Sequence, residues 1–110
     1  MTVTVGNLRD GMPDWSDRTN VYVGRAFAGL QASPLQNPYT IGRDGDRREV
    51  VRKYETFIQA LLQDSHFNAQ QGELWDISAA IETSGDITLW CWCVPEECHA
   101  EVIQRIVEGG

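Results

Sequence analysis

The sequence lacks the features that mark membrane and secreted proteins. No stretch approaches the roughly 20 consecutive apolar residues that cross a bilayer. The first six residues, MTVTVG, lack the basic region and long apolar stretch of a signal peptide. Only three cysteines are present, Cys91, Cys93 and Cys98, and a disulfide framework would spread an even number along the chain. We therefore expect a cytoplasmic protein with no membrane partner.

Basic residues are also scarce. Nine Lys and Arg stand against sixteen Asp and Glu, so the formal net charge is −7 and the pI is about 4.6. Because phosphate contacts with nucleic acids need clustered positive charge, we expect no direct nucleic-acid binding. Lys53 is the one lysine, and an arginine-dominated set favours forked recognition of carboxylate or phosphate groups. An arginine bias of the source genome would produce the same composition.

The length of 110 residues predicts a single domain, and an apolar fraction of 42% with four tryptophans is sufficient for one modest core. Alternating residues predict strands at 2–8 and 21–25, and an almost continuous apolar run predicts a third strand at 87–94. Apolar residues at helical spacing predict three helices, over residues 46–63, 73–83 and 96–107. The long connection over 26–45 has a length that is usually functional or mobile in compact domains.

This order of elements predicts a small three-layer, Rossmann-like α/β domain over residues 1–110, with a short, mostly parallel sheet and about three helices. The strand at 87–94 would be the central one. Because its run of apolar residues leaves no polar face, we expect helices to cover the sheet on both sides.

A cluster of cysteine and histidine follows this central strand. Cys91 and Cys93 share one face of the strand, since residues two apart point the same way. Cys98 and His99 then fall in the first turn of the last helix, beyond the carboxyl end of the strand, where open α/β sheets bind ligands. A thiol at a helix N-terminus has a lowered pKa, so Cys98 is a candidate nucleophile and His99 a candidate acid–base group.

Three other interpretations of this cluster stay open. Free cysteines are among the most buried residues, so Cys91 and Cys93 are equally consistent with an inert core. Two or three cysteines with His99 could hold zinc, but the spacing is not Cys-x-x-Cys, and neighbours on a helix diverge by about 100°. A redox pair of Cys93 and Cys98 is the third. We assign no metal ligand here.

Two further motifs could bind a ligand. In Val21-Tyr-Val-Gly-Arg25, Gly24 permits close backbone approach at a strand end, and Arg25 could clamp a phosphate or carboxylate. Arg25 could equally pair with a surface carboxylate. In Asn37-Pro38-Tyr39, the residue before proline is held extended, which can present Asn37 or Tyr39 to a planar ligand. Ordinary turn chemistry explains the same residues.

Taken together, these motifs resemble a family of small domains of unknown function found largely in phages and bacteria. The pattern comprises VYVGR at 21–25, NPY at 37–39, the helix bearing Tyr54, and CWC at 91–93 followed by Pro95 and CHA at 98–100. It covers roughly residues 20–107. The Cys-His pair is also similar to an uncharacterised α/β family that ends in Cys-His-Arg, although Ala100 stands in the arginine position. The resemblance implies a Rossmann-like domain whose site contains Arg25, Asn37, Tyr39, Cys93, Cys98 and His99.

We expect this site to bind, and in an enzyme to hydrolyse or transfer, a nucleotide- or nucleobase-derived small molecule. Arg25 would hold the anion, Asn37 and Tyr39 would contact the planar part, and Cys98 or His99 would carry out the chemistry. Two alternatives stay open: an acidic phage protein that inhibits a host protein, and a small structural zinc domain. No cofactor is assigned.

Overall fold

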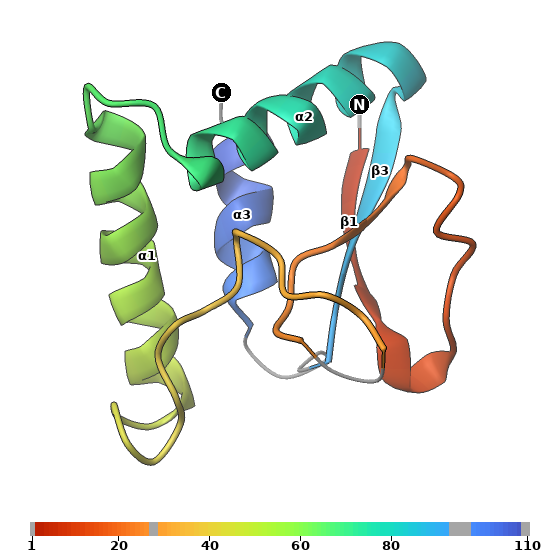
Figure 1. Cartoon of the computed structure of the whole chain (residues 1–110). Coiled ribbons are helices and arrows are strands. Elements are labelled where there is room, and N and C mark those ends of the chain that lie inside the picture. The colour runs from red at the N-terminus through yellow and green to blue at the C-terminus, as the bar shows by residue number, and fades with distance from the viewer. Residues whose placement is uncertain (1, 27–28, 93–97, 109–110) are drawn as a thin grey trace.

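The computed structural model describes residues 2–26, 29–92 and 98–108 (Figure 1). The elements follow in the order β1 (Thr2–Asn7), the 3₁₀ helix η1 (Leu8–Asp10), β2 (Asn20–Tyr22), α1 (Arg47–Gln63), α2 (Ala69–Ser84), β3 (Asp86–Cys91) and α3 (His99–Glu108). Across these described ranges, none of the helices has the length and apolar character to cross a membrane.

Three parallel strands form the sheet in the order β1-β3-β2. Leu89 in the middle of β3 pairs with Val5 on one side and with Val21 on the other. The prediction of a parallel sheet with its third strand at the centre is therefore confirmed. Because all three strands run the same way, their carboxyl ends meet at one edge.

The two faces of this sheet are covered differently. Ile87, Leu89 and Cys91 on one face of β3 are almost completely buried and share one apolar core with residues of all three helices. Thr88 and Trp90 on the other face are only half-buried. Figure 1 shows the helices on one side of β1 and β3. The expectation of helices on both faces was therefore wrong.

Tryptophan explains why the apolar run was misleading. The indole of Trp90 lies flat against Gly6, where an added Cβ would come within 2.7 Å of the ring, and its Nε1 donates a hydrogen bond to Asn20 Oδ1 at 2.9 Å. Trp15, from the loop between β1 and β2, meets the Tyr22 ring edge-on at 6.1 Å. Since tryptophan pairs a large apolar surface with a polar N–H, it suits a half-buried face.

The helix boundaries follow from capping. Asp46 accepts a hydrogen bond from the Glu49 amide at 2.9 Å, and Glu49 Oε1 accepts one from the Asp46 amide at 3.2 Å, so the expected capping box starts α1. Helix α2 begins earlier than the expected residue 73, because Asn68 Oδ1 accepts from the Gln71 amide at 2.8 Å. Gly85 ends α2 with a φ of 85°, a left-handed conformation that favours glycine.

Both elements around the cysteine-rich segment are shorter than expected. The third strand was expected to reach residue 94, but β3 ends at Cys91. The last helix was expected to begin at residue 96, but α3 begins at His99. Residues 93–97 lie outside the described part of the chain.

Side chains of α3 bind the outer edge of β1. Gln104 Nε2 donates to the Val3 carbonyl at 2.7 Å, and Glu108 Oε1 accepts from the Val3 amide at 3.2 Å.

The capping box predicts a measurable stability effect. Asp46→Ala removes the acceptor for the Glu49 amide and should lower the free energy of unfolding by about 1 kcal/mol. Urea denaturation followed by circular dichroism measures this change. Glu82→Ala, on the exposed surface of α2, is the control and should change stability by less than about 0.5 kcal/mol. Equal effects of the two substitutions would show that the box contributes nothing.

Candidate functional site

A cavity of about 720 Å³ opens at the edge of the sheet where the strands end. Its walls come from the segments that follow the three strands, from the 37–41 segment of the long connection, and from the first turns of α1 and α3. The lining residues are Arg9, Gly24, Arg25, Ala26, Asn37, Tyr39, Thr40, Ile41, Arg47, Val50, Val51, Cys91, Trp92, Cys98 and His99. We call this cavity the edge pocket. It contains every described residue of the expected site.

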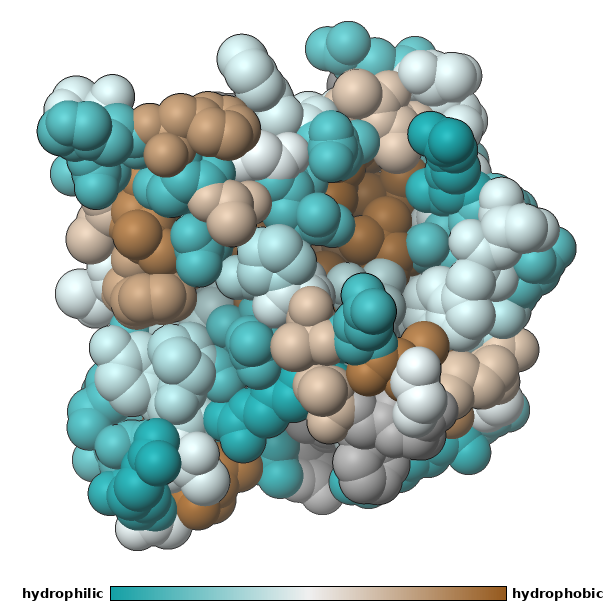
Figure 2. Space-filling view, in the orientation of Figure 1, coloured by the Kyte–Doolittle hydropathy of each residue, from teal (hydrophilic) through white to brown (hydrophobic). Residues whose placement is uncertain are grey.

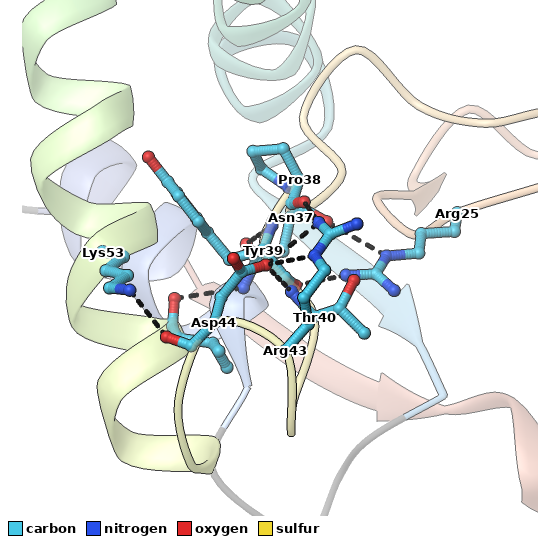
Figure 3. Close-up of polar contacts among 9 residues, drawn as sticks. Arg25, Asn37, Pro38, Tyr39, Thr40, Arg43, Asp44 and Lys53 are labelled. Atoms are coloured by element: carbon cyan, nitrogen blue, oxygen red, sulfur yellow. Dashed lines mark hydrogen bonds and ion pairs between the residues drawn. The ribbon is translucent and has the colours of Figure 1, made fainter.

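Arg25 shapes the wall of the edge pocket by holding the chain at residues 37–39. Its Nε donates to the Asn37 carbonyl at 3.0 Å, and a second guanidinium nitrogen donates to the Tyr39 carbonyl (Figure 3). The partners are thus backbone carbonyls, and the described part of the chain places no carboxylate in an ion pair with Arg25. The surface ion pair that the sequence left open as an alternative is not seen there. Backbone carbonyls do not neutralise the guanidinium, so Arg25 keeps its positive charge.

Asn37 continues this connection to α1. It is only 8% exposed; its Nδ2 donates to the Val50 carbonyl at 3.3 Å, and its Oδ1 accepts from the Tyr39 amide at 2.9 Å. The amide side chain therefore organises its own turn, and one N–H and one lone pair remain for other contacts. This geometry is the turn chemistry that the sequence left open for Asn37.

The far side of the same segment is fastened by charged groups. Asp44 Oδ2 accepts from the Thr40 amide at 2.8 Å, and Lys53 Nζ donates to the Asp44 carbonyl at 2.6 Å (Figure 3). The bond from Thr40, together with Arg43, lowers the pKa of Asp44. The Tyr39 ring packs edge-on against Phe57 at 6.2 Å. The segment that forms one wall of the pocket is thus held from both sides.

His99 joins the beginning of α3 to the end of β2. Its Nε2 lies 2.6 Å from the Val23 carbonyl, and its ring meets Tyr54 edge-on at 5.1 Å. A carbonyl only accepts, so we assign the proton to Nε2 and leave Nδ1 as an acceptor. Burial lowers the pKa of His99 to about 4, and the charge of Arg25 acts in the same direction. The imidazole is therefore neutral at pH 7 and does not change charge near neutrality.

The two described cysteines meet in the wall of the edge pocket. Both are 1% exposed, and the sulfur atoms of Cys91 and Cys98 are 3.0 Å apart. Cys98 takes part in a disulfide bond that does not involve Cys91, and its sulfur lies 3.6 Å from His99 Nδ1. Because the thiolate is the nucleophile of cysteine chemistry, Cys98 can act as one only after reduction. Cys93, the remaining expected site residue, lies outside the described residues.

No metal centre emerges from the described residues. Within 2–26, 29–92 and 98–108, no group of three or more His, Cys, Asp or Glu side chains is arranged to hold a metal ion. The zinc interpretation involved Cys93, so it stays a hypothesis that elemental analysis of the protein would decide.

Two arginines and a tryptophan of the lining were not identified as site residues from the sequence. Arg9 follows β1 within η1, Arg47 is the first residue of α1, and Trp92 follows β3. Trp92 Nε1 donates to the Tyr22 hydroxyl at 3.0 Å, and this hydroxyl donates to the Arg25 carbonyl. Arg9 could have been found, because it follows a strand as Arg25 does. Arg47 could not, because nothing local indicates that α1 begins beside the sheet edge.

The fold and the edge pocket define a small α/β domain with a cavity of about 720 Å³ at the carboxyl edge of a parallel sheet. The chain belongs to the family described as "Domain of unknown function (DUF4326)", whose model matches residues 7–109. The expected membership of a family of domains of unknown function is thus confirmed. No curated protein and no solved structure matches the chain significantly.

Burial of neutral His99 predicts a pH dependence of stability. The unfolded chain takes up a proton on this imidazole below about pH 6.5, but the folded protein does so only below about pH 4. The unfolded state therefore binds more protons in this window, and stability falls as the pH is lowered from 6.5 to 4, by about 3 kcal/mol from this group. Urea denaturation at pH 7 and 4.5 should show a smaller loss for His99→Gln than for the wild type.

The second histidine supplies the control for this comparison. The side chain of His66 is 92% exposed, so His66→Gln should keep the wild-type pH dependence. If His99→Gln and the wild type lose equal stability on acidification, then His99 is not buried in its neutral form.

The forked contacts of Arg25 predict a local effect. Arg25→Ala should accelerate hydrogen exchange of the Tyr39 amide, because two bonds that hold this turn are lost. Global stability should change by less than about 1 kcal/mol, since Arg25 is exposed and outside the core. Arg48→Ala, on the exposed side of α1, should leave the Tyr39 amide unchanged. Unchanged exchange in Arg25→Ala would refute this positioning role.

Proposed function

We propose that the protein binds a small anionic molecule, nucleotide- or nucleobase-derived, in the edge pocket. The observation that carries the proposal is the convergence of Arg9, Arg25 and Arg47 from three separate segments on one cavity. The chain as a whole has a net charge of −7, so three arginines around one cavity depart from its average composition. Cations gathered in a concave site of an acidic protein favour an anionic ligand.

Shape and chemistry narrow the ligand class. Ligand pockets typically measure about 300–1,000 Å³ and combine apolar walls with a few polar groups. The edge pocket falls in this range and has Ile41, Val50 and Val51 among its apolar residues. Tyr39 and Trp92 are also among the lining residues, and a planar base can stack on aromatic side chains. A phosphate matches the fork of an arginine, so a molecule with a phosphate and a planar ring uses both.

The expected site residues then have separate roles. Arg25 supplies charge and also holds the 37–39 turn, Asn37 fixes that turn, and Tyr39 adds an aromatic residue to the lining. In the reduced protein, Cys98 would be the nucleophile of a transfer reaction, and neutral His99 would orient the thiol through Nδ1, which lies 3.6 Å from the sulfur. Turnover would therefore depend on a reductant, whereas binding would not.

Calorimetric titration with a defined panel tests the proposal. The panel holds AMP, ADP, ATP, GMP, UMP and NAD, the free nucleosides and inorganic phosphate. We expect at least one nucleotide to bind more tightly than its nucleoside, and the affinity to fall by about tenfold in Arg9→Ala and in Arg47→Ala, which is typical of losing one charged hydrogen-bonded contact. Repeating the titration with dithiothreitol and analysing the products detects turnover.

Arg48→Ala is a matched control, because Arg48 is the helical neighbour of Arg47 and does not line the cavity. It should change the affinity by less than twofold. Arg25→Lys keeps the charge without the fork and separates charge from positioning. The proposal is wrong if no member of the panel binds, or if the three lining arginines can be replaced without effect.

The alternative function, an acidic protein that inhibits a host protein, needs a protein partner. It leaves the edge pocket without a role. Arg25, Asn37 and His99 all line the edge pocket, which is the arrangement that a small-molecule site requires. This supports the small-molecule proposal as the first to test.

A further inference from the structure

A second depression lies outside the edge pocket. It has a volume of about 500 Å³ and runs between α2 and the segment around β2. Its lining residues are Arg18, Val21, Glu73, Asp76, Ile77, Ala79, Ala80, Thr83 and Ser84, none of which lines the edge pocket. Figure 2 shows a hollow with a hydrophobic floor and a hydrophilic rim on this side of α2. We call this depression the α2 groove.

Its acidic residues lack partners within the described chain. Glu73 and Asp76 are three positions apart on α2 and therefore lie on the same side of the helix. Across the described ranges, neither carboxylate takes part in an ion pair or a side-chain hydrogen bond. Burial raises the pKa of Glu73, and the charge of Asp76 adds to the effect. Two like charges beside an apolar floor would be stabilised by an incoming cation.

The length of the α2 groove favours an extended peptide over a small amine as its occupant. Its α2 residues extend from Glu73 to Ser84, eleven positions that span about 16 Å at the helical rise. An extended peptide covers this distance with about five residues. Val21 and Ala80 are only partly buried and offer an apolar surface for aliphatic stems, and Thr83 and Ser84 offer hydroxyls at the far end. Arg18 also lines the groove and disfavours a uniformly basic occupant.

We propose that the α2 groove is a docking site for an extended segment of another protein, with a lysine or arginine placed at Glu73 and Asp76 and apolar residues over Val21 and Ala80. Long basic side chains suit this arrangement, because the stem packs on apolar surface while the charged end reaches a carboxylate. The net charge of −7 would also steer a basic partner toward the protein. This interaction is independent of a ligand in the edge pocket.

The test uses three defined probes with the complete chain. They are the capped peptide Val-Arg-Val-Lys-Val, its acidic counterpart Val-Glu-Val-Asp-Val, and spermine. Titration followed by NMR should show that the basic peptide shifts the amides of Ala79, Ala80 and Thr83, and that the acidic peptide does not. The double substitution Glu73→Gln with Asp76→Asn should weaken binding by about tenfold, because each exposed ion pair contributes only modestly.

Matched variants and the other probes decide the outcome. Glu82→Gln removes a carboxylate from the same helix outside the groove, and it should change the affinity by less than twofold. Spermine binding as tightly as the peptide would mark a small-amine site and overturn the proposal. Absence of binding by the basic peptide, or equal binding by Glu73→Gln with Asp76→Asn, would overturn it as well.

Discussion

The backbone of Val23 connects the elements on which the edge pocket depends. Its amide donates to the Trp90 carbonyl at 3.1 Å, which extends the β2–β3 pairing beyond the end of β2, and its carbonyl lies 2.6 Å from His99 Nε2. One completely buried residue therefore ties β2 to β3 and to the first residue of α3. Gly24 then follows, where a Cβ would come within 2.6 Å of the Tyr22 hydroxyl, so the chain can turn closely toward the pocket.

Charge is distributed unevenly over this small domain. Three arginines line the edge pocket, and two carboxylates line the α2 groove beside a single arginine. The strand ends and the first turn of α1 bring the arginines together, although they are 16 and 22 positions apart in the sequence. Net charge of −7 therefore describes the whole surface and not each site on it. A small domain with two differently charged concave surfaces can offer one to an anion and the other to a basic chain.

Much of the fold could be predicted because local patterns and packing agree. The apolar stripe through Tyr54 and Ile58, together with Asp46 and Glu49, defines α1 without any distant contact. The parallel sheet follows from the order of strands and helices. The number of layers could not be derived, because an apolar run with tryptophans is compatible both with a strand covered on both faces and with one whose second face is half-buried. Asn20, seventy residues from Trp90, supplies the partner that decides between them.

The candidate site shows the same division. The sequence by itself determined that Arg25 and the Cys98-His99 pair follow strands, and strand direction brings such positions to one edge. Only the tertiary structure decided what these residues do there. Arg25 binds backbone carbonyls of a segment twelve or more residues away, and His99 becomes neutral because its ring is buried against Tyr54 and Val23. Side-chain protonation and hydrogen bonding depend on neighbours that are distant in the sequence, and folding alone brings those neighbours into contact.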